Sequence, residues 1–97
     1  MSKKSTYKLG GITSDQIRAG RALIRWSAAD LAREAKLGLA TIRRAEVADG
    51  ATSMTVANEL AVRRALEAAG VEFIDENGGG PGVRLREHQR SKQSKLA

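Results

Sequence analysis

The sequence predicts a mainly α-helical domain of four to five helices, followed by a small C-terminal β-hairpin. Apolar residues recur at helical spacing through most of residues 14–69, and cap residues stand near the ends of these stretches. Two short alternating segments then flank a glycine-rich stretch at 77–82. With 97 residues the chain suffices for one domain. We place that domain at residues 11–86, between a flexible basic arm at 1–10 and a flexible polar tail at 87–97.

The first helix should begin after a capping box. Thr13 can accept a hydrogen bond from the backbone of Gln16, whose side chain can reach back to residue 13. Apolar residues that follow at helical spacing predict a helix over about 14–25. These residues are Ile17, Gly20, Leu23 and Ile24.

Two short helices follow, separated by a break at 36–38. Ser27 is a favourable N-cap for a helix over 28–35, with Asp30 placed to reach back to the cap. The sequence KLG then interrupts the pattern, and residues 39–47 supply a third helix that ends before an Asp-Gly pair.

The fourth helix should be the longest. It starts near Ser53 or Thr55 and runs to Ala69, and the glycine that follows can adopt the left-handed conformation common after helix ends. Residues 71–74 and 83–86 alternate apolar and polar, which predicts a hairpin that must pack on the helices or on another chain. The residues offered to the core by this helix are Val56, Leu60, Ala61 and Leu66.

The composition excludes several classes of function. Because the chain has no cysteine, it holds no disulfide and no thiolate metal site, which fits the reducing cytoplasm. His88 is the only histidine, and the stretch NGGGPG lacks the lysine and the following helix of a phosphate-binding loop. No apolar run approaches the roughly 20 residues of a membrane helix. We therefore expect a cytoplasmic protein that is not an enzyme, needs no cofactor or metal, and does not enter a membrane.

Positive charge is concentrated toward the two ends of the chain. The net charge is +6, with 10 basic and 4 acidic residues in 1–46, 2 and 6 in 47–76, and 5 and 1 in 77–97. This asymmetry suits a polyanion such as nucleic acid, although many soluble domains carry a similar imbalance as ordinary surface.

Residues 12–46 contain an ordered set of features around the two short helices. These are Arg21 in the first helix, Trp26-Ser27 before the second, Leu31-Ala32 within it, Ala35 at the turn, and Thr41-Ile42 and Glu46 in the third helix. The set resembles the helix-turn-helix domain of Cro/C1-type (XRE) transcriptional regulators. The stretch LEAAGVEFIDENGGGPGVRLR is also similar to the C-terminal part of short bacterial members of that family. Ala28, Lys36 and Gly38 depart from the residues common in relatives, which have Gln, Gly and Ser there.

The resemblance implies that the third helix enters the major groove of DNA while the start of the second touches a phosphate. It also implies that Arg21 and Glu46 pair with each other. Arginines can form bidentate hydrogen bonds to guanine or contact phosphate, and small or apolar side chains can meet thymine methyl groups. The expected DNA-contacting residues are Ser27, Ala28, Lys36, Leu39, Ala40, Thr41, Arg43 and Arg44.

Several of these residues can instead have a purely structural or solvent-exposed role without any DNA contact. The side chains of Arg43 and Arg44 can simply be exposed to water, and the Thr41 hydroxyl can form a hydrogen bond with the backbone of its own helix. Trp26 is more often a buried helix-junction residue than a base-stacking one. Basic residues of the arm, hairpin and tail can reach phosphates or only solvate the chain. They are Lys3, Lys4, Lys8, Arg84, Arg86, Arg90, Lys92 and Lys95.

We expect a sequence-specific, double-stranded DNA-binding regulator of transcription, most simply a dimeric repressor in the bacterial cytoplasm, associated with the nucleoid. The hairpin can pair edge to edge with a second copy and so form a two-fold dimer. The alternative is a protein-interaction module on the same fold, such as an antiactivator or an antitoxin. The absence of Gln at position 28 keeps that alternative open.

Overall fold

The computed structural model describes residues 11–87, and within that range it contains four helices and one antiparallel two-stranded sheet. The lower of the two predicted helix numbers is therefore confirmed for the described part of the chain, together with the hairpin. The predictions for the arm and for the residues from His88 onward lie outside it. The elements are α1 (Ser14–Ile24), α2 (Ala28–Ala35), α3 (Leu39–Val47), α4 (Val56–Ala68), β1 (Val71–Ile74) and β2 (Gly82–Leu85).

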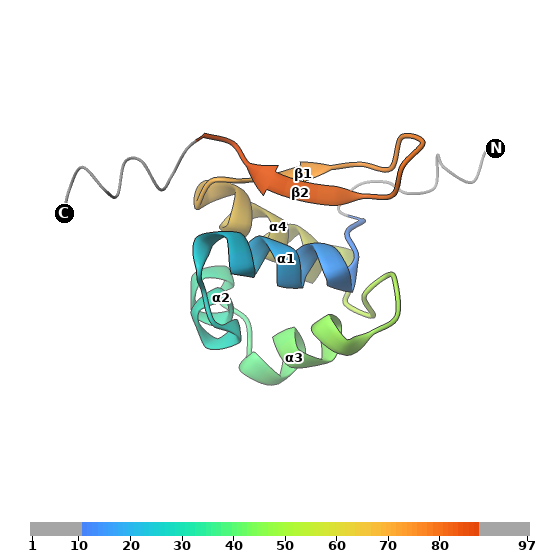
Figure 1. Ribbon diagram of the computed structural model, residues 1–97. Coiled ribbons are helices and arrows are strands. Elements are labelled where there is room, and N and C mark those ends of the chain that lie inside the picture. The colour runs from blue at the N-terminus through green and yellow to red at the C-terminus, as the bar shows by residue number, and fades with distance from the viewer. Residues whose placement is uncertain (1–10, 88–97) are drawn as a thin grey trace.

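The hairpin and α3 lie on opposite sides of the molecule, with α1 and α4 between them (Figure 1). β1 packs against α4, β2 packs against α1, and α2 contacts both α3 and α4. The hairpin thus packs on helices of its own chain, as a two-stranded sheet requires. In Figure 1 the side of α3 that faces away from α1 is not covered by any other described element.

One apolar core joins the helices to the first strand. Its fully buried aliphatic side chains come from all four helices and from β1, namely Ile17, Leu31, Ile42, Val62, Leu66 and Val71. The hairpin contributes its inner face, where Phe73 is 8% exposed and lies opposite Val83 in the register.

One prediction of a buried apolar residue was wrong. Val56 is 61% exposed, whereas Val62, which was not predicted, is fully buried. The buried stripe of α4 passes through Glu59, Val62 and Leu66, and Val56 lies about 120° away from Val62 around the helix. Leu23 of α1 is also exposed, at 38%. Leu60 and Ala61 are half-buried.

Local hydrogen bonds explain where the helices begin. Both predicted capping boxes are present, at Thr13 with Gln16 and at Ser27 with Asp30. Thr55, the second of the two predicted starts, caps α4 by accepting a hydrogen bond from the backbone N–H of Asn58.

The links α1–α2 and α2–α3 have the same backbone design. Each ends its helix in a left-handed residue, Arg25 or Lys36, both with φ of 60°. The residue after each, Trp26 or Leu37, donates its N–H to a carbonyl five positions back at 3.0 Å and 2.9 Å, respectively. Trp26 is partly buried and packs against the core, as expected of a helix-junction residue. Two similar turns thus set the directions of α2 and α3.

Candidate nucleic-acid interface

α3 has one face in the core and the opposite face in solvent. Successive residues are turned by about 100° around a helix. The buried positions share one side, and they are Ile42, Ala45 and Glu46. The four exposed positions fall within an arc of about 100° on the other side. They are Ala40, Arg43, Arg44 and Val47, and we call this set the outer face of α3.

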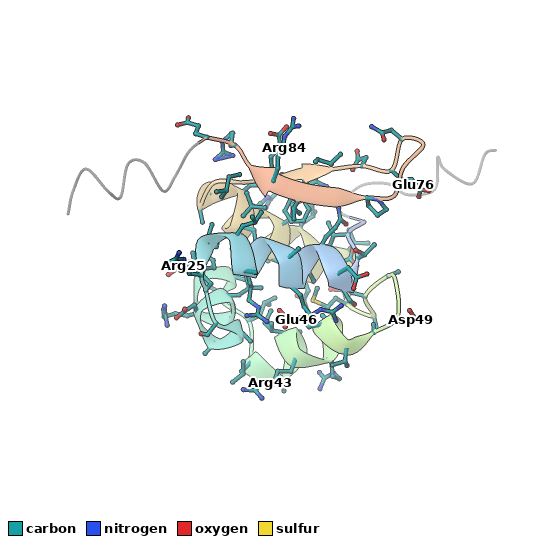
Figure 2. The ribbon with its side chains drawn as sticks, in the orientation of Figure 1. Arg25, Arg43, Glu46, Asp49, Glu76 and Arg84 are labelled. Carbon is teal, nitrogen blue, oxygen red and sulfur yellow. The ribbon has the colours of Figure 1, made fainter. Side chains whose placement is uncertain are left out.

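The two arginines of the outer face have no partner in the described part of the chain. Most other arginines there form an ion pair or bond a carbonyl. Arg18 pairs with Asp15, for example, and Arg63 pairs with Glu67. Figure 2 shows Arg43 pointing away from the other elements. Among residues 11–87, the cations without an ion pair or side-chain hydrogen bond are Arg25, Lys36, Arg43, Arg44 and Arg64.

The predicted contact residues therefore divide into two groups. Exposed residues, whose side chains are open to a partner, are Ser27, Lys36, Ala40, Arg43 and Arg44. Half-buried ones are Ala28, Leu39 and Thr41, of which Ala28 and Leu39 pack against the core. The structure thus leaves the arginines of α3 more available than Leu39 and Thr41 near its start.

Ser27 already has a structural role as the cap of α2. Its hydroxyl accepts the N–H of Asp30 at 3.0 Å, and its own N–H donates to the Asp30 carboxylate at 2.9 Å. This backbone hydrogen bond, with help from Arg33, lowers the pKa of Asp30 below its ordinary value. The cap therefore fixes the start of α2 whether or not a ligand is bound.

Three side chains of α1 hold the C-terminal end of α3. Ser14 donates its hydroxyl to the carbonyl of Ala45, and Arg18 donates to the carbonyl of Glu46. Arg21 binds the Glu46 carboxylate through two nitrogens, at 2.7 Å and 2.8 Å. These positions satisfy carbonyls that a helix end leaves without partners. α3 is therefore oriented by α1 as well as by core packing.

The predicted pairing of Arg21 with Glu46 is confirmed. This pairing neutralises the only negative charge on α3. Glu46 is the only acidic residue of α3 and is 7% exposed, between α1 and α3 (Figure 2). Its hydrogen bond raises the pKa of Arg21 above the ordinary value. With that carboxylate buried and paired, the outer face presents positive charge only.

Two parts of this arrangement were not predicted from the sequence. The roles of Ser14 and Arg18 were not predicted, although residues 14, 18 and 21 share one narrow face of α1 at helical spacing. Val47 is 78% exposed and also went unnoticed. Its place on the outer face follows from counting about 100° per residue from Ala40.

The arginines of the hairpin are engaged within the domain. Arg84 pairs across the strands with Glu72 at 3.1 Å, which raises the pKa of Arg84 and lowers that of Glu72. Arg86 donates to the carbonyl of Glu67 at 2.8 Å. Since the hairpin also lies on the side opposite α3 (Figure 1), these arginines do not extend the outer face of α3.

The described residues contain no helix long and apolar enough to cross a membrane, and α4, the longest helix, has 13 residues. Neither the family models nor the curated protein sequences include a match to this chain.

Proposed function

We propose that this protein is a DNA-binding regulator of transcription that places the outer face of α3 in the major groove of a specific duplex. The observation that carries the proposal is the pair of exposed, unpartnered arginines, Arg43 and Arg44, directly opposite the buried face of a short helix. The resemblance of residues 12–46 to Cro/C1-type helix-turn-helix domains supports it.

The shape of the domain suits this role. The major groove is about 12 Å wide and admits an α-helix. Nine residues make α3 about 13 Å long, which matches roughly four base-pair steps. The uncovered side of α3 can enter the groove without moving the hairpin, because the hairpin lies on the far side of the domain (Figure 1).

A two-fold dimer belongs to the proposal. Pairing of two hairpins at their edges leaves α3 of each copy uncovered, so the two helices can read half-sites about 34 Å apart. Such a protein acts most simply as a repressor, by occupying DNA that the transcription machinery needs. Sedimentation equilibrium at micromolar concentration should give twice the chain mass, and a monomer would remove this part of the proposal.

The test is selection of duplexes from a random library, followed by fluorescence anisotropy on the selected duplex and on a scrambled one. We expect the selected duplex to bind at least 100-fold more tightly. Arg43→Ala and Arg44→Ala should each lose most of that preference. Arg64→Ala is the matched control, because it removes an exposed, unpartnered arginine from α4 and should leave the preference unchanged.

Equal, weak binding of every duplex at all salt concentrations would overturn the proposal. A protein partner whose binding depends on Arg43 would then favour the interaction-module alternative.

A further inference from the structure

We infer that α3 recognises guanines, one on each strand, together with a thymine methyl group, and makes no side-chain hydrogen bond to adenine or cytosine through its outer face. This inference rests on the proposed function and names the class of DNA that the same surface takes.

The chemistry of the outer face limits what it can read. Adenine is read in the major groove by Asn or Gln, and cytosine by the acceptor oxygens of Asp or Glu. The outer face has none of these residue types. The one carboxylate of α3, on Glu46, is buried and bound twice by Arg21. Arginine, in contrast, matches the N7 and O6 acceptors of guanine.

The positions of the two arginines separate their targets. Taking Ala40 as the origin, Arg44 lies about 40° to one side and Arg43 about 60° to the other. The two guanidinium groups therefore leave α3 on opposite flanks and face opposite walls of a groove. Neither has an acidic partner within the described residues that would draw it away. The geometry assigns them to two guanines on different strands.

Ala40 lies between the arginines and one turn nearer the start of α3. The early residues of a recognition helix are the ones that approach base edges. The exposed Ala40 methyl group has no polar atom and faces the floor of the groove, where a thymine methyl group offers an apolar contact. Val47 lies on the same face one turn beyond the arginines, close in sequence to the exposed Asp49, and we do not assign it a base.

Single-atom changes in the selected duplex test the inference with the full-length protein. Replacing a contacted guanine by 7-deazaguanine removes one acceptor and should weaken binding about tenfold at two positions, one on each strand. Replacing the contacted thymine by deoxyuridine removes a methyl group and should weaken binding about fourfold. Replacing adenines by 7-deazaadenine is the matched control, with no effect expected.

Protein variants then connect each contact to its residue. Arg43→Ala should become insensitive to 7-deazaguanine at one of the two positions, and Arg44→Ala at the other. Ala40→Gly should bind the thymine and deoxyuridine duplexes equally well. These are ratios measured within one variant, so a general loss of stability does not produce them.

The outcomes distinguish the two proposals. If no preferred duplex emerges from selection, the proposed function fails and this inference fails with it. If a preferred duplex emerges but its affinity falls with 7-deazaadenine and not with 7-deazaguanine, only this inference is overturned. Loss of sensitivity at the same guanine in both arginine variants would also overturn it.

Discussion

The ion pair between Arg21 and Glu46 should be the strongest single tie between α1 and α3. The perturbation is Glu46→Gln, which keeps the shape of the side chain but removes its charge. The amide can accept only one of the two guanidinium hydrogen bonds, and its N–H groups face those of Arg21. We therefore expect Arg21 to lose most of the electrostatic attraction that offsets the removal of water from its partly buried guanidinium in the folded protein.

The magnitude follows from the burial of the pair. The side chains of Arg21 and Glu46 are 22% and 8% exposed. Exposed pairs contribute about 0–1 kcal/mol, whereas removing one partner of a fully buried pair costs about 3–5 kcal/mol. This pair lies nearer the buried limit, so Glu46→Gln should lower the free energy of unfolding by about 2–3 kcal/mol. That is a large part of the roughly 4–11 kcal/mol expected for a domain of this size.

The assay is urea denaturation followed by far-UV circular dichroism and by the fluorescence of Trp26, the only tryptophan. Arg21→Met should cost a similar amount, because it leaves the Glu46 carboxylate buried without a partner. The double variant Arg21→Met with Glu46→Leu should recover to within about 1 kcal/mol of the original protein, because an apolar pair can replace a buried ion pair. Costs below 1 kcal/mol for both single variants, adding up in the double, would refute the reasoning.

Three other changes have defined outcomes. Lys36→Gly should raise the free energy of unfolding by about 0.5–1 kcal/mol, because glycine adopts the left-handed conformation at φ of 60° without the strain that lysine has there. The loss of a positive charge should also lower the salt dependence of DNA binding. Unchanged stability would contradict the first expectation. Gln16→Glu should cost about 2 kcal/mol and speed hydrogen exchange in the hairpin, because Gln16 Nε2 donates to the carbonyls of Gly82 and Ile74 at 3.0 Å and 3.4 Å. The lowered pKa of Asp30 contributes stability that is present above its ordinary unfolded value and is lost as the pH falls through the folded value. An NMR titration should give a midpoint below that of an unstructured aspartate, and Ser27→Ala, which removes the smaller contribution of the Ser27 hydroxyl, should raise it.

Most helix ends could be predicted because each depends on residues within four positions of it. Thr13, Ser27 and Gly70 act through their own backbone or side chains, so their effects follow from short-range rules. The left-handed Arg25 and Lys36 were not predicted as such, because glycine is the residue that usually marks this conformation.

The burial of individual side chains was harder to predict, because it depends on the rotation of each helix about its axis. Counting apolar residues put Val56 in the core of α4, but the direction in which α4 faces is set by α2 and the hairpin. The role of Ser14 could not be predicted for the same reason, because its hydroxyl donates to a carbonyl 31 positions away in the sequence. The pairing of Arg21 with Glu46 was expected only because a family resemblance supplied that long-range contact.

Net charge does not single out the proposed DNA surface. Residues 11–87 contain 11 basic and 11 acidic residues, so the whole excess of +6 belongs to residues 1–10 and 88–97. Within the described domain, ion pairs engage five of the ten arginines, and Arg43 and Arg44 on α3 are among those left unpaired. Attraction to phosphate depends on total charge, whereas base preference depends on where unpaired donors stand. The proposed mechanism thus divides the two tasks: the terminal lysines and arginines add affinity that salt screens, and α3 supplies the choice of sequence.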